Sequence, residues 1–134
     1  FSTEFFQQTF LQKGLYFDQF EMERVGQGAY VQAKYKVNNK LSVLARAERF
    51  YVDKNDKNGS KLEKSTQGLV PHYFGYQNDV TLGLSYDLGQ HSRIQLEYHK
   101  VQGTGRLTPI VLPDATTNNE EYWDIWALQL MYWF

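Results

Sequence analysis

Two side chains of this chain are spaced for acid–base or metal chemistry. Glu97 and His99 are two positions apart, so in a β-strand they project from one face and could share a proton or a metal ion. The pair has neither a third ligand nor a nucleophile, which makes it a weak signal for a catalytic site. His72 and His91 fall in a predicted loop and a predicted turn, where solvation is the ordinary interpretation. We therefore expect no enzyme activity and no cofactor.

Residues 53–59 (DKNDKNG) have the oxygen-rich composition of a calcium loop. However, Lys57 stands where such a loop needs an oxygen ligand, and Lys54 adds positive charge beside it. We interpret the segment as a solvated surface loop and predict no metal site.

The composition favours strands and excludes several classes of protein. The net charge is −1 with both signs interspersed, so there is no basic surface for nucleic acid. The absence of cysteine excludes a disulfide framework, a thiolate metal site and a cysteine nucleophile. Sixteen per cent of the residues are aromatic and only 3 are proline, which favours β-strands. No apolar run approaches the ~18 residues of a membrane helix, whereas a membrane strand needs only ~9–11 residues with alternate positions apolar.

Alternation of apolar and polar residues predicts about seven antiparallel strands. The first three are residues 2–11, 15–25 and 29–37, joined by turns at 12–14 and 26–28. Strands near 41–48 and 80–88 flank a long polar segment at 52–78, and strands near 93–99 and 122–134 flank a second one at 103–121. The connection Asn38-Asn39 suits a tight hairpin, because Asn tolerates a left-handed backbone.

Residues 15–25 fit this pattern poorly. Phe20 and Met22 share a face with Asp18 and Arg24, and a carboxylate facing lipid is costly. A β-bulge near Asp18–Gln19 would repair the pattern. Alternatively, this surface meets protein rather than lipid.

The strand at 122–134 has the most distinctive face. Its alternate residues Trp126, Leu128, Leu130, Tyr132 and Phe134 are apolar throughout and aromatic at both ends. This is typical of a membrane strand whose middle lies in hydrocarbon and whose ends lie at the two interfaces.

A final Phe, a Tyr two positions before it and alternating apolar residues resemble the C-terminal assembly signal of Gram-negative outer-membrane β-barrels. The chain also resembles a group of poorly characterised proteobacterial porin-like proteins over most of residues 28–134. The resemblance rests on residues 28–35 (GAYVQAKY), 44–50 (LARAERF), 93–105 (RIQLEYHKVQGTG) and 123–130 (WDIWALQL). Trp133 departs from it, since many relatives have a basic residue there. The resemblance implies an all-β fold, an antiparallel transmembrane β-barrel in the bacterial outer membrane, and an assembly signal at Leu130, Tyr132 and Phe134.

Loop lengths give this expected barrel a direction. With Phe134 at the periplasmic end, the long loops 52–78 and 103–121 lie outside, and the connections at 12–14, 37–40 and 88–92 lie on the periplasmic side. Seven strands is an odd number, and an open sheet in lipid would leave backbone groups unsatisfied. We therefore expect residues 1–134 to be a single but incomplete barrel segment, the C-terminal part of a larger barrel, unless an eighth strand escapes the pattern.

The alternation divides the strand residues between two predicted surfaces. The predicted lumen-lining residues are Gln32, Lys34, Lys36, Ser42, Arg46, Glu48, Thr81, Ser85, Asp87, Arg93, Gln95, Glu97 and His99. The predicted lipid-facing residues are Val31, Tyr35, Val43, Val80, Leu82, Leu84, Tyr86, Ile94, Leu96, Tyr98, Trp126, Leu128 and Leu130. Charged rings in a lumen select solutes by charge and size. A simpler interpretation is that Arg46–Glu48 and Arg93–Glu97–His99 only pair across strands and hold the wall together.

The expected function is that of a porin for passive diffusion of small hydrophilic solutes. The expected partners are outer-membrane lipid, the barrel assembly machinery, and either other protein chains or further copies of this one. Two alternatives stay open: a barrel that holds a partner protein in an outer-membrane complex, and a soluble ligand-binding β-barrel whose apolar faces point inward.

Overall fold

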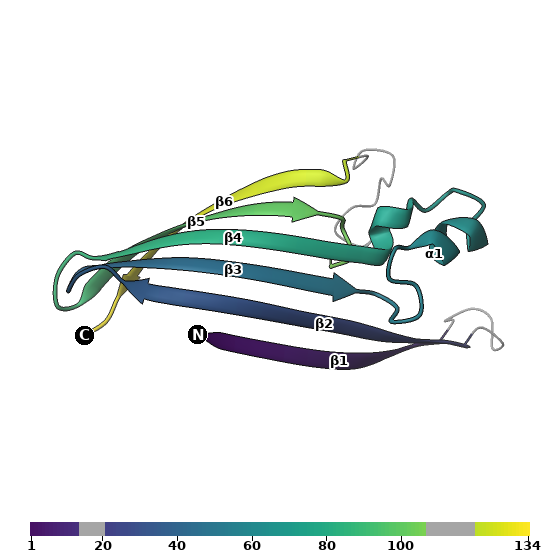
Figure 1. The fold of residues 1–134 in the computed structure, drawn as a ribbon, viewed down its shortest axis with the longest axis horizontal. Coiled ribbons are helices and arrows are strands. Elements are labelled where there is room, and N and C mark those ends of the chain that lie inside the picture. The colour runs from purple at the N-terminus through teal and green to yellow at the C-terminus, as the bar shows by residue number, and fades with distance from the viewer. Residues whose placement is uncertain (14–20, 107–119) are drawn as a thin grey trace.

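The computed structural model describes residues 1–13, 21–106 and 120–134, and shows one antiparallel sheet (Figure 1). Its 6 strands follow the order β1-β2-β3-β4-β5-β6. They are β1 (Ser2–Lys13), β2 (Glu21–Lys36), β3 (Leu41–Tyr51), β4 (Tyr76–Asp87), β5 (Ser92–Gln102) and β6 (Tyr122–Tyr132). The predicted all-β class is confirmed. Within the described residues β1 and β6 each pair on one side only, so the sheet is not closed into a barrel.

The prediction of seven strands is wrong, because β2 continues through the turn expected at 26–28. Gly28 pairs with Phe6 of β1, and a Cβ atom added at Gly28 would lie 2.4 Å from Cζ of the Phe6 ring. Glycine here makes room for a neighbouring ring and does not turn the chain. The bulge proposed near Asp18–Gln19 lies outside the described residues.

The two ends of the sheet carry different connections. Residues 37–40 and 88–91 form the short-turn end, where Asn38 Oδ1 accepts the backbone N–H of Lys40 at 2.9 Å. The opposite end, the loop end, carries residues 52–75, 103–106 and 120–121, together with Lys13 and Glu21, where β1 ends and β2 begins. The prediction that residues 12–14 share the short-turn end is wrong for Gln12 and Lys13, which pair with Met22 and Glu21 at the loop end; Gly14 is not described.

The connection from β3 to β4 is shorter than the predicted 52–78, since β4 begins at Tyr76. It contains a short helix, α1 (Ser60–Ser65), and a 3-10 turn, η1 (His72–Gly75). Residues 103–105 fold back against it, because Thr104 N–H bonds to the Tyr73 carbonyl at 2.9 Å. No helix in the described part of the chain is both long and apolar enough to span a bilayer.

The buried apolar side chains gather at the loop end and not in the middle of the sheet. They are Phe50, Tyr73, Tyr76 and Val101. Along most of their length the strands therefore leave both faces uncovered by other parts of the described chain.

Candidate functional site: a sheet with one apolar and one polar face

The strand register assigns the two predicted surfaces to opposite faces of the sheet. Val31, Ala47 and Val80 are cross-strand partners on one face, and Gln32, Arg46 and Thr81 on the other. The same division continues through β5 and β6, where Leu96 pairs with Leu128 and Gln95 with Gln129. All the predicted lipid-facing residues lie on one face, here called the apolar face, and all the predicted lumen-lining residues lie on the other, here called the polar face.

The apolar face is bare. Leu128 is 71% exposed and Leu130 70%, and Phe5 of β1, Tyr35 of β2 and Leu82 of β4 are each more than half exposed, whereas Val43 of β3 and Leu96 of β5 are just over a third exposed. Contiguous apolar patches of more than a few hundred Å² are rare on soluble monomers and mark contacts with membranes or other proteins.

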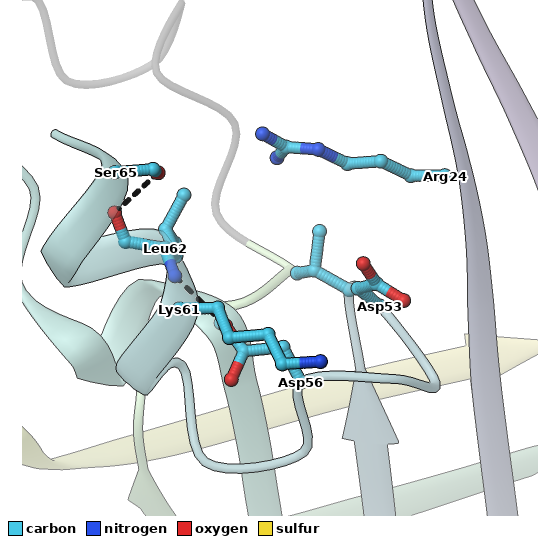
Figure 2. A pocket seen from close by; sticks show the side chains of 8 residues that line it. Arg24, Asp53, Asp56, Lys61, Leu62 and Ser65 are labelled. Carbon is cyan, nitrogen blue, oxygen red and sulfur yellow. Dashed lines mark hydrogen bonds between the residues drawn. The ribbon is translucent and has the colours of Figure 1, made fainter.

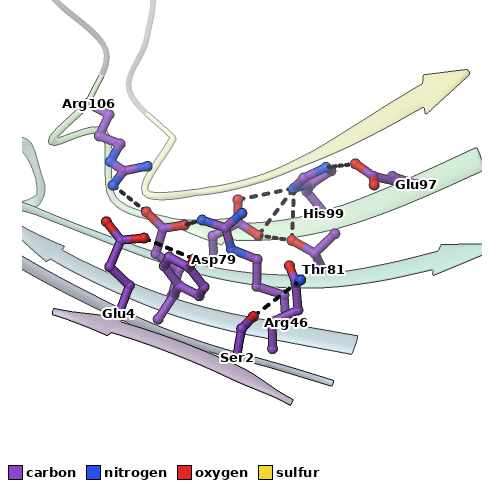
Figure 3. A network of polar contacts seen from close by, with 11 residues as sticks. Ser2, Glu4, Arg46, Asp79, Thr81, Glu97, His99 and Arg106 are labelled. Carbon is purple, nitrogen blue, oxygen red and sulfur yellow. Dashed lines mark hydrogen bonds and ion pairs between the residues drawn. The ribbon is translucent and has the colours of Figure 1, made fainter. Parts of the chain in front are cut away.

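Ion pairs cross the polar face (Figure 3). Glu48 of β3 contacts Arg46 on its own strand and Arg106 from the segment after β5. The Glu48 side chain is only 8% exposed, and the Arg46 guanidinium lies 4.3 Å from the centroid of the Tyr30 ring. Arg46 and Glu48 form the predicted pair, but along β3 and not across neighbouring strands. Arg106 is a contact that strand alternation does not reveal, because it reaches Glu48 from a loop.

His99 lies between two carboxylates. Its Nδ1 is 3.1 Å from Asp79 Oδ2, and its Nε2 is 3.4 Å from Glu97 Oε2. The structure therefore brings Glu97 and His99 together, as their spacing predicts. It adds Asp79 and Thr81, whose Oγ1 donates to Asp79 Oδ1 at 2.9 Å. Asp79 escapes sequence reasoning because it lies next to the predicted loop 52–78.

This cluster joins β4 to β5 and does not converge on a point. Each ring nitrogen of His99 has its own carboxylate neighbour. In the described ranges no group of 3 or more His, Cys, Asp or Glu side chains is arranged to hold a metal ion. The geometry is that of a polar bridge between neighbouring strands of the sheet.

Arg93 does not join Glu97, which corrects the predicted trio Arg93–Glu97–His99. Arg93 Nε donates instead to Asp87 Oδ1 at 2.6 Å, across the β4–β5 pair. Lys34 and Lys36 form no ion pair within the described residues. Lys34 and Lys36 are therefore unpaired in the described ranges, whereas Arg46 of β3 and Arg93 of β5 each pair with a carboxylate.

Residues 53–59 use their carboxylates to shape the loop (Figure 2). Asp53 Oδ1 accepts the N–H of Asn55 at 2.8 Å, and the buried Asp56 accepts the N–H of Leu62 in α1 at 2.9 Å. Arg24 and Lys61 line the pocket beside them. Asp53 and Asp56 thus have backbone partners.

The other two histidines lie outside the strands. His72 is 4.0 Å from both Glu63 and Glu121, and His91 is exposed in the short turn before β5. Hydrogen bonds from Gln102 and Tyr76, both 2.7 Å long, hold the pKa of the Glu121 carboxyl below its ordinary value of 4.5. Glu121 therefore links the start of β6 to β4 and β5.

Comparisons of the chain with protein-family models, curated proteins and solved structures return no match. Membership of the porin-like group remains a prediction.

Proposed function

We propose that this sheet is part of the wall of a membrane-spanning β-barrel in a bacterial outer membrane, and that the barrel is a channel for small hydrophilic solutes. The observation that carries the proposal is the division of the sheet into a bare apolar face and an ion-paired polar face. A membrane barrel needs both, apolar residues toward lipid and polar residues toward water. A soluble ligand-binding barrel would turn its apolar face inward, and would leave the Arg46–Glu48–Arg106 cluster outside.

Aromatic residues near the short-turn end support a membrane position. On the apolar face they are Tyr35 in β2, Tyr86 in β4 and Tyr132 in β6, and they are not level with one another. In the strand register, Tyr35 lies in the same cross-strand row as Leu84, and Tyr86 lies in the same row as Leu130. Residues in one such row are here called level. The line through the three tyrosines thus moves about 13 Å along the strands while crossing about 19 Å of sheet, an inclination of roughly 35°.

A second aromatic line near the loop end has the same inclination. Phe5 in β1 is level with Asn78, and Tyr98 in β5 is level with Leu82. This shift again amounts to about 13 Å along the strands over about 19 Å of sheet. Beyond this line, toward the loop end, the same face carries polar side chains: Arg49, Asn78, Lys100 and Asp124.

Two parallel aromatic lines are expected where strands cross a bilayer at a tilt. Aromatic residues prefer both membrane interfaces, and barrel strands tilt by roughly 35–45°. Along β4 and its following turn, the apolar positions extend from Val80 to Leu88, two residues past the aromatic line at Tyr86. That distance is about 27 Å along the strand and about 22 Å after the tilt, close to the ~25 Å apolar band of such barrels. A flat docking surface for a soluble protein has no reason to follow a slanted band.

The proposed orientation puts the short-turn end in the periplasm and the loop end outside. The residues of the proposed assembly signal, Leu130, Tyr132 and Phe134, then lie at the periplasmic end, where we propose that the barrel assembly machinery binds them. In lipid the free edges of β1 and β6 need further strands. These two strands run in opposite directions, so further strands in even number would close an antiparallel barrel, whether they come from this protein or from further copies of it.

The test is the conductance of the purified protein in a planar bilayer. We expect discrete open-channel steps in potassium chloride, which protein unfolded by heat does not give. Protein that is folded and inserted but gives no steps would contradict the channel and favour a barrel that holds a partner. Protein that stays soluble without detergent would contradict the membrane position itself.

A further inference from the structure

The middle of the polar face contains a trough. It is lined by Gln32, Lys34, Leu44, Gly83, Gln95 and Glu97, with Ser85 beside them. Its floor is Gly83: a Cβ atom added there would lie 3.1 Å from Leu44 Cβ and 3.5 Å from Glu97 Cγ. Because Gly83 of β4 has no side chain, the side chains of Leu44 on β3 and Glu97 on β5 border an open space above it.

The two banks of the trough carry opposite charges. Lys34, Leu44, Gly83 and Glu97 form one cross-strand row from β2 to β5, which separates the Cα atoms of Lys34 and Glu97 by about 14 Å. Lys34 has no ion pair in the described part of the chain. Glu97 accepts a hydrogen bond from Gln95 at 2.6 Å and lies 3.4 Å from His99.

The remaining lining suits an amide-bearing ligand. Gln32, Gln95 and Ser85 offer donors and acceptors between the charged banks, and Leu44 offers an apolar contact. A purely anionic solute would meet Lys34 but be repelled by Glu97, and a purely cationic solute would meet the reverse. A solute that has an ammonium group at one end and a carboxylate at the other satisfies both banks.

We propose that the trough binds a short zwitterionic peptide, with its carboxylate at Lys34 and its ammonium group at Glu97. Lys34 and Glu97 both line the trough, and their long side chains can place the charged ends closer together than the ~14 Å between the Cα atoms. An extended peptide advances about 3.5 Å per residue, so two or three residues fit the gap. A single amino acid carries both charges on one carbon and is too short. The inference rests on the proposed function in one respect, because the trough must face a space that solutes enter.

The experiment is calorimetric titration of the detergent-purified protein with trialanine, N-acetyl-trialanine, trialanine amide and a neutral disaccharide. We expect saturable binding of trialanine, about tenfold weaker binding of each capped peptide, and no binding of the sugar. Lys34→Gln should weaken trialanine binding about tenfold and remove the difference between trialanine and its amide. Glu97→Gln should do the same for the N-acetyl peptide.

The matched control is Lys36→Gln, which removes the same charge one alternate residue along β2, outside the trough. It should change trialanine binding less than twofold, with each variant first shown to be folded by circular dichroism. Equal binding of the capped and free peptides, or an equal effect of Lys34→Gln and Lys36→Gln, would overturn the inference. Conductance of the same preparation separates the two proposals: channel steps without peptide binding refute the trough alone, and binding without steps supports the trough and refutes the channel.

Discussion

Arginine placed at Leu128 should destabilise the protein severely, whereas arginine at the adjacent Gln129 should not. Both side chains are exposed on β6, but Leu128 lies on the apolar face opposite Leu96, and Gln129 on the polar face opposite Gln95. On a water-exposed sheet the two substitutions would be nearly equivalent, since surface changes cost within about 0.5 kcal/mol. The difference in stability between the two variants therefore shows whether each face of the sheet meets lipid or water.

The expected magnitude follows from the position of Leu128 in the apolar band. It lies in β6 between the aromatic residues Trp126 and Tyr132 and is 71% exposed, so most of its surface would meet hydrocarbon. Arginine near the middle of a bilayer costs about 2–4 kcal/mol on a barrel wall. This lowers the folded-to-unfolded ratio by roughly 30- to 1,000-fold. Arginine at Gln129 should cost less than about 0.5 kcal/mol.

The assay is urea unfolding of each variant in phosphatidylcholine vesicles, followed by tryptophan emission. The unfolding midpoint should fall for Leu128→Arg and stay near the original for Gln129→Arg. Equal midpoints for both variants would refute the assignment of the apolar face to lipid. A lower midpoint for Gln129→Arg alone would reverse the two faces.

Three further predictions concern packing, pH and assembly. Gly28→Ala should cost about 1–3 kcal/mol, because the new methyl group clashes with the Phe6 ring; unfolding of the double variant with Phe6→Ala should show a loss smaller than the sum of the single losses. Folding lowers the pKa of the Glu121 carboxyl, so its stabilising contribution is present above the unfolded pKa and is lost as the pH falls through the folded pKa. Below a pH of about 4.5, the free energy of unfolding of Glu121→Gln should therefore change less with pH than that of the original protein. The same pH dependence in both proteins would contradict the hydrogen-bonded carboxylate. Phe134→Asp should block insertion into the outer membrane, measured by fractionation; normal insertion with altered conductance would make Phe134 an ordinary wall residue.

The sequence predicts the two faces well, because a strand period of two is a local property. From β3 to β6 the apolar and polar alternation alone assigns each residue to its face. Pairs along one strand, such as Glu97 with His99 on β5, follow from the same spacing. The partner Asp79 does not, since it lies between the predicted loop 52–78 and the predicted strand that begins at Val80.

Two features, the glycines inside β2 and the contact of Arg106, are harder to predict from the sequence. Gly26 and Gly28 are typical of a turn, and only the approach of Phe6 from the neighbouring strand explains a glycine inside β2. Arg106 presents a similar difficulty, because its contact with Glu48 depends on how residues 103–105 fold back at the loop end. Such features depend on tertiary contacts, which spacing along one strand does not encode.

The slanted aromatic lines allow the most direct test of the membrane position. Polarised infrared spectroscopy of the protein in oriented lipid layers measures the mean angle between its strands and the membrane normal. The register of Tyr35, Tyr86 and Tyr132 predicts an angle of roughly 35°. Strands lying flat on the membrane plane, or amide bands without dichroism, would contradict a sheet that spans the bilayer.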